Sequence, residues 1–199
     1  MSIPVVADAD TLYPAATRGL LIHLDLHGLI HLHWSPLLLD EAMRALVKTG
    51  RRPSLTDARA HQELLCQVLP LAMVAVRDVQ SQFQAVQGAV NSAKDLHVAA
   101  CAHWLAAARM HPEAAPVALL TGNTRDFKKN ALAKLGIALH RPDAFLLGLF
   151  QAQASEFRRA FQALLEALPS KPLAEALLEK LRRDGLDQTV RALQFFMAK

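Results

Sequence analysis

Two kinds of apolar pattern alternate along the first 150 residues of the chain. Short apolar runs bounded by turn residues predict buried strands, and stretches with apolar residues every three or four positions predict helices between them. Gly28, Gly50 and Gly136 end three of the helical stretches, as glycine commonly does. The expected strands are 5–7, 29–34, 70–76, 117–121 and 137–140, and the main expected helices are 15–27, 36–49, 56–69, 93–110 and 142–150.

The alternation of strands and helices predicts an α/β fold with a central parallel sheet covered by helices on both faces. Residues 78–92 are polar and suggest a surface loop with one helical turn. No strand pattern follows residue 150, where three amphipathic helices are expected at 152–168, 172–183 and 187–198. We therefore expect a sheet domain over residues 1–150 and an all-helical C-terminal extension over 151–199.

The composition adds limits on compartment and partners. The chain has 199 residues, of which 52% are hydrophobic, enough for one sizeable core. It contains no apolar run of the roughly 18 residues that a membrane span needs and no secretory signal pattern. Its two cysteines, Cys66 and Cys101, are isolated, which favours a reducing, cytoplasmic location. The net charge of +4 is weak support for an anionic partner such as nucleic acid.

Acidic and amide side chains follow two of the expected strands. Asp8 and Asp10 come directly after the first strand, and Asn123 and Asp126 come just after strand 117–121. Parallel sheets bind ligands at the carboxyl ends of their strands. If these two strands are neighbours, all four side chains lie at one edge of the sheet.

Two further acids belong to helices, and each acid has a plainer explanation. Glu41 lies beside the apolar stripe of its helix, and Asp95 opens the long helix 93–110. However, Glu41 could be a solvated helix residue, and Ser92 with Asp95 matches a capping box. The acids after the strands could likewise be ordinary cap and turn residues. The combination of positions at one edge is harder to explain by caps than any single acid.

Four segments taken in order resemble the signatures of PIN-domain ribonucleases, the VapC toxins of type II toxin–antitoxin pairs. They are VVADADTLYPA, WSPLLLDEAMRAL, KDLHVAACA and LLTGNTRDF, and the likeness extends over residues 4–148. It implies a PIN-like sheet, and some proteins of this kind also carry a helical C-terminal extension. Two departures are evident: Asp10 stands where relatives often have Asn, and Asn123 stands where many have Asp.

The resemblance also implies a catalytic site. The acidic cluster of the family falls on Asp8, Glu41 and Asp95, with a fourth position at Asn123 or Asp126. Such oxygen ligands suit Mg²⁺ or Mn²⁺. Asp8 and Asp95 would bind the metal, and Glu41 and Asp126 would complete its shell or orient a water molecule. A divalent ion could then activate that water to cleave phosphodiester bonds of single-stranded or loop RNA.

The resemblance to PIN toxins also suggests which basic residues contact RNA and which partners the chain has. Arg18, Arg125, Lys128 and Lys129 could hold phosphates of the RNA, although each could equally be a solvated helix charge. PIN toxins are commonly homodimers bound by a small antitoxin that binds DNA. We expect such a partner for this chain and no membrane association.

Three alternatives stay open. A PIN scaffold that binds a partner without cutting is conceivable because of Asn123. A haloacid-dehalogenase-like phosphatase would use Asp8 as its nucleophile, but ADADTL lacks the glycine usual in that motif. A zinc site at His23, His27 and His31 would need further ligands, and the pair lacks the Glu of H-E-x-x-H.

Overall fold

A parallel sheet of four strands forms the centre of the computed structural model, which describes residues 2–111, 116–170 and 173–197. The strand order is β2-β1-β3-β4, and every neighbouring pair is parallel. The carboxyl ends of all four strands therefore lie along one edge. The strands are β1 (Ile3–Ala7), β2 (Ile30–His33), β3 (Val117–Leu120) and β4 (Ile137–His140).

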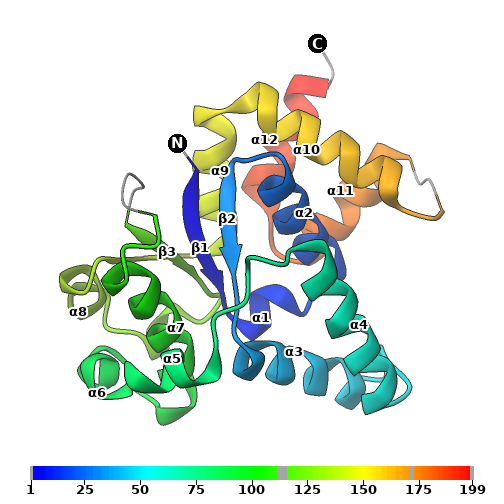
Figure 1. The fold of residues 1–199 in the computed structure, drawn as a ribbon. Coiled ribbons are helices and arrows are strands. Elements are labelled where there is room, and N and C mark those ends of the chain that lie inside the picture. The colour runs from blue at the N-terminus through cyan, green and yellow to red at the C-terminus, as the bar shows by residue number, and fades with distance from the viewer. Residues whose placement is uncertain (1, 112–115, 171–172, 198–199) are drawn as a thin grey trace.

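Helices occupy most of the remaining described chain (Figure 1). Short 3₁₀ turns lie at Gln87–Ala89, Ala93–Asp95 and Thr124–Asp126. The helices are α1 (Ala9–Leu12), α2 (Ala15–Leu26), α3 (Pro36–Lys48), α4 (Leu55–Val68), α5 (Val76–Ser81), α6 (Phe83–Val86), α7 (Leu96–Ala107), α8 (Lys129–Lys134), α9 (Pro142–Ala152), α10 (Ala154–Ala167), α11 (Ala174–Arg183) and α12 (Asp187–Met197).

The two central strands, β1 and β3, are buried on both faces, as their continuous apolar sequences require. Along β1, Val5 and Ala7 contribute to one hydrophobic cluster and Val6 to the other. Figure 1 shows α5 to α8 on one side of the sheet and α2 with α9 to α12 on the other. The predicted α/β class, with a parallel sheet flanked by helices, is confirmed.

The last three helices pack against the sheet-bearing part of the chain. Helix α10 packs on α2, and α12 packs on α9. The approach of α10 to α2 is close, because a Cβ atom at Gly19 would lie 3.0 Å from Cδ1 of Leu164. Hydrogen bonds also join the two parts: the Asp143 carboxylate accepts from Thr189 N at 2.9 Å, and Asp184 accepts from Thr17 Oγ1 at 2.9 Å.

Two predictions about residues 70–92 were wrong. The expected strand 70–76 is reduced to a single parallel bridge between Met73 and Trp34. The expected loop 78–92 instead holds α5, α6 and a 3₁₀ turn, because Val79 and Val86 turn inward and pack in the core. None of the helices described is long and apolar enough to cross a membrane.

Candidate functional site

Asp8 joins the ends of the two central strands. Strands β1 and β3 are paired so that Ala7 lies opposite Leu120, and Asp8 N donates to Leu120 O at 2.8 Å. The Asp8 Oδ1 atom accepts from Ala9 N at 2.6 Å and so caps α1, while Oδ2 accepts from Thr121 Oγ1 at 3.0 Å. Asp8 therefore is a helix cap, but its second oxygen faces across the sheet edge.

Asp10, two residues after Asp8, makes a second connection to the segment that follows β3. Its Oδ2 atom accepts from Gly122 N at 2.9 Å, and its Oδ1 atom accepts from Thr11 Oγ1 at 3.1 Å. A Cβ atom at residue 122 would lie 2.9 Å from Asp10 Oδ2. Glycine at that position therefore allows the close approach of this carboxylate to the chain that follows β3.

Two loops pair and bring Asp126 beside the start of α7. Val90 and Phe127 form an antiparallel bridge, and Asn91 N donates to Asp126 O at 2.7 Å. Within the second loop, Asn123 Nδ2 donates to the Asp126 carboxylate. The amide and the acid therefore lie together, and both remain candidates for the fourth position of the predicted acidic site.

Asp95 is not engaged as a helix cap. Ser92 Oγ accepts from Lys94 N at 3.2 Å, but no side-chain hydrogen bond to the Asp95 carboxylate occurs in the part of the chain that the structure describes. The capping-box interpretation of Ser92 and Asp95 is therefore not supported. Burial raises the pKa of Asp95, and the negative charges of Asp126 and Glu41 raise it further.

Glu41 reaches the same edge from α3. Its side chain is 55% exposed, and its Oε2 atom lies 3.2 Å from Nε2 of His97, in the first turn of α7. Burial, followed by the charge of Asp10 and, more weakly, that of Glu41, raises the pKa of Asp8 to about 7. Glu41 therefore raises the pKa of both Asp8 and Asp95, which links the acid after β1 to the acid before α7.

The four predicted acids, which we call the acidic row, do not form a preformed metal cage; they are Asp8, Glu41, Asp95 and Asp126. Across residues 2–111, 116–170 and 173–197, no group of three or more His, Cys, Asp or Glu side chains is arranged to hold a metal ion. Their chemistry still fits one: carboxylate oxygens are the ligands that Mg²⁺ and Mn²⁺ prefer, and a cation would relieve their mutual repulsion. The donor types therefore match the predicted metal, while the arrangement is not preformed.

Three of the four predicted RNA contacts lie near this row. Arg125, Lys128 and Lys129 are exposed and belong to the loop and helix that follow β3. Arg18 is different: it is buried, and its Nη1 atom donates to the carbonyl oxygens of Leu12 and Tyr13. Its guanidinium group therefore stabilises the turn between α1 and α2 and is not part of the basic surface at the sheet edge.

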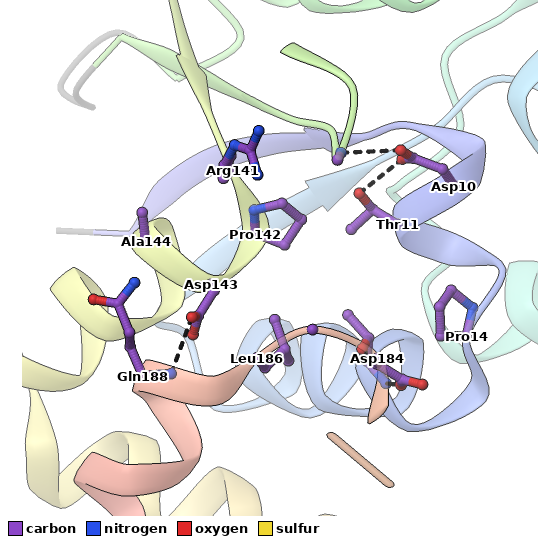
Figure 2. A pocket seen from close by; sticks show the side chains of 13 residues that line it. Asp10, Thr11, Pro14, Arg141, Pro142, Asp143, Ala144, Asp184, Leu186 and Gln188 are labelled. Atoms are coloured by element: carbon purple, nitrogen blue, oxygen red, sulfur yellow. Dashed lines mark hydrogen bonds between the residues drawn. The ribbon is translucent and has the colours of Figure 1, made fainter. Parts of the chain in front are cut away.

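A hollow of about 400 Å³ lies between the sheet edge and the C-terminal helices (Figure 2). It includes Asp10 but none of the other predicted acids. Two of its carboxylates are already used as helix-end acceptors, Asp143 for α12 and Asp184 for α2. The hollow is therefore mainly a structural junction. Its polar lining consists of Asp10, Thr11, Thr17, Arg141, Asp143, Asp184 and Gln188.

Thr121 and His97 contact two of the predicted acids, Asp8 and Glu41, and the sequence analysis missed both contacts. A threonine after a strand resembles any turn residue, and His97 is one of nine histidines without a diagnostic spacing. The zinc alternative also finds no support: the ring of His31 stacks on His111 with centroids 4.5 Å apart. His31 therefore contacts His111, and this contact does not involve the other two histidines of the suggested zinc site, His23 and His27.

Replacing Thr121 by Val is expected to lower the free energy of unfolding by roughly 1–3 kcal/mol, as loss of a buried hydrogen-bonding group usually does. The hydroxyl is fully buried, donates to Asp8 and accepts from Asn123 N at 3.1 Å, so both partners lose a contact at almost constant side-chain volume. Urea denaturation measures the change. Thr124→Val, at a half-buried position, is the matched control, and equal stabilities of the two variants would contradict the role given to Thr121.

The candidate site therefore consists of the acidic residues, Asn123 and the nearby basic residues at the carboxyl edge of the sheet. Comparison of the chain with protein-family models, with curated proteins and with solved structures found no match.

Proposed function

We propose that this protein is a Mg²⁺- or Mn²⁺-dependent endoribonuclease of the PIN type. The observation that carries the proposal is the gathering of acids from four separate segments at the carboxyl edge of a parallel sheet. Asp8 follows β1, Glu41 lies on α3, Asp95 precedes α7, and Asp126 follows β3. The Asp95 carboxylate is committed to no helix cap, which leaves it available as a ligand.

The residues have distinct proposed roles. Asp8 and Asp95 would hold the cation, with Glu41 and Asp126 completing its shell or orienting water. A bound divalent ion would supply Lewis-acid activation of water and neutralise charge on the phosphate. Thr121 fixes the orientation of the Asp8 carboxylate through its 3.0 Å hydrogen bond.

RNA is the proposed substrate because basic residues border the acids. Arg125, Lys128 and Lys129 are exposed, and none of them forms an ion pair in the described part of the chain. Contacts of this kind to phosphates supply much of the affinity for single-stranded RNA and weaken with salt. The resemblance to PIN toxins adds a cytoplasmic location, a homodimer, a small DNA-binding antitoxin and a helical C-terminal extension to the proposal.

A second candidate is a PIN-type scaffold that binds a partner but cuts nothing. The open arrangement of the acids favours it, since the described residues contain no preformed metal group. Asn123 also favours the scaffold, because an amide in place of a further carboxylate leaves the site with one negative charge fewer. Both candidates use the same edge, so cleavage of RNA distinguishes them.

Cleavage of a 5′-labelled single-stranded RNA is expected to need Mg²⁺ or Mn²⁺ and to stop in EDTA. Asp8→Asn and Asp95→Asn should each slow it by at least about 100-fold, because loss of even an outer-shell partner costs 10–100-fold in metal sites. Asp40→Asn is the matched control: this exposed acid precedes Glu41 on α3, and its loss should change the rate less than about twofold.

Four outcomes would overturn the nuclease assignment. The parent could cut equally well in EDTA, or Asp8→Asn could cut as fast as the parent. RNA binding without cleavage under any metal condition would support the scaffold. An aspartyl adduct trapped with beryllofluoride would indicate the phosphatase chemistry instead.

A further inference from the structure

Three arginines and a histidine gather where α2, the turn after α3, and α4 meet. We call this group the arginine cluster; it consists of Arg18, Arg51, Arg52 and His61. The four residues come from three separate segments, so the cluster is made by the tertiary fold. It is distinct from the acidic row and from the basic residues after β3.

Arg18 is a buried charge without an acidic ion-pair partner. Its residue surface is 6% exposed, and no carboxylate in the described residues forms an ion pair with it. Its Nη2 atom lies 3.1 Å from Nε2 of His61. Because a guanidinium can only donate, that histidine nitrogen must accept, and His61 is neutral in this contact. The hydrogen bonds of Arg18 to Leu12 O, Tyr13 O and His61 Nε2 use three of its five N–H donors but do not neutralise its charge, and a buried unpaired charge is costly.

The nearest charged neighbours increase the positive potential. Burial lowers the pKa of Arg18 to about 10, and the charges of Arg52 and Arg51 contribute to this shift. Burial also lowers the pKa of His61 to about 4, with contributions from the charges of Arg18 and Arg52. Asp184 is the acid that partly compensates, but its Oδ2 atom already accepts from Thr17 N and Oγ1 at 3.2 and 2.9 Å. The cluster therefore keeps an excess of positive charge.

Arg51 and Arg52 make this charge accessible. Arg51 is exposed and Arg52 half-buried, whereas Arg18 lies beneath the surface. Their backbone N–H groups both donate to Leu46 O, at 2.9 and 3.1 Å, which fixes the turn after α3. The guanidinium carbon of Arg51 lies 4.5 Å from the centroid of the Tyr13 ring, a cation–π contact that further orders this arginine.

We propose that the arginine cluster binds a phosphate group. Guanidinium forks match the geometry of phosphate oxygens, and an anion here would provide the countercharge that Arg18 lacks. The assignment of this phosphate to the backbone of the substrate RNA rests on the proposed function. In that case the cluster is a second anchor for the RNA, separate from the acidic row.

Binding of single-stranded RNA in EDTA tests the proposal, measured by fluorescence anisotropy across a range of salt. The Asp8→Asn chain serves as the background, so that no cleavage disturbs the titration. Adding Arg51→Gln and Arg52→Gln should weaken binding about tenfold for each lost charge-assisted contact. The slope of log affinity against log salt should fall by about 0.7 per lost phosphate contact. Arg18 is left unchanged because its loss would disturb the fold.

Control variants distinguish a specific phosphate site from a general effect of positive charge on RNA binding. Arg51→Lys and Arg52→Lys should keep most of the salt slope, because a lysine still neutralises a phosphate. Arg77→Gln and Arg183→Gln should leave binding unchanged, since these exposed arginines pair with Asp78 and Glu179. Equal weakening by the control and cluster variants would overturn the proposal.

Inorganic phosphate distinguishes the source of the anion. If phosphate competes with RNA on the parent but not on the Arg51→Gln/Arg52→Gln chain, the RNA assignment is supported. If phosphate raises the melting temperature of the parent alone while RNA affinity is the same for both, the RNA assignment is overturned and a free phosphate is the ligand. Loss of RNA affinity in these variants, with no cleavage by the parent, would support the cluster and refute the nuclease.

Discussion

A chain that ends at Gln153 is expected to be unfolded. The truncation removes α10 to α12, whose inward side chains share one hydrophobic cluster with β1 and α2. Full burial of a large apolar side chain contributes about 1.5–3 kcal/mol, so the loss exceeds about 10 kcal/mol and matches the whole stability of a typical domain. The buried side chains lost include Phe157, Phe161, Leu164, Leu177, Leu181, Val190 and Leu193.

Circular dichroism and urea denaturation of residues 1–153 measure this outcome. A single substitution, Phe157→Ala, gives the graded comparison and should cost about 3–5 kcal/mol, as large-to-small changes at buried aromatic positions do. A truncated chain that unfolds cooperatively with native helix content would contradict the expectation. That result would support a sheet domain that folds independently of its helical extension.

Acidification is expected to destabilise the protein through His33. The residue is 5% exposed, and its Nε2 atom lies 2.8 Å from Nε2 of His111. Burial, followed by the charge of His111, lowers the pKa of His33 to about 4. An unfolded histidine titrates near 6.5, so between pH 6.5 and 4 only the unfolded chain binds the proton. The contribution of His33 is therefore complete above pH 6.5 and is lost as the pH falls to 4.

The size of this contribution is on the order of 3 kcal/mol by proton linkage. Asp8 acts with the opposite sign: its raised pKa favours the folded state at low pH and withdraws that support as the pH rises toward 7. The difference between the parent and His33→Gln isolates the histidine, because Asp8 is present in both. Urea denaturation from pH 7 to pH 4 should show the parent losing on the order of 3 kcal/mol more than the variant. Parallel stability curves would refute this role, and His27→Gln, at an exposed histidine, should follow the parent.

The sheet could be predicted because its signals are local. Val5 to Ala7 and Val117 to Leu120 are continuous apolar runs, which is what a strand buried on both faces needs. The segment around Met73 has a similar run, but Met73 and Leu71 are exposed and only one bridge forms at the outer side of β2. Whether an apolar run pairs with a neighbouring strand depends on the rest of the fold. The local pattern therefore predicted a strand at 70–76 where only one bridge forms.

At the candidate site, the positions of some side chains could be predicted from the sequence, but their contacts could not. Asp8 and Asn123 could be placed at one edge because strand ends follow from the apolar runs. The engagement of Asp8 by Thr121, and of Glu41 by His97, depends on side chains from elements distant in sequence. The burial of Arg18 involves a contact with His61 on α4, which the sequence does not reveal. The resemblance to PIN toxins therefore suggested an accessible phosphate contact.

The packing of α10 on α2 has a consequence for synthesis on the ribosome. Helix α2 leaves the exit tunnel well before α10 and α11, two later helices that pack on it. Until they emerge, the side of α2 at Gly19 lacks its native cover, although β2 and α1 already pack on the same helix. Chaperones that bind nascent apolar segments therefore have a defined target in this side of α2.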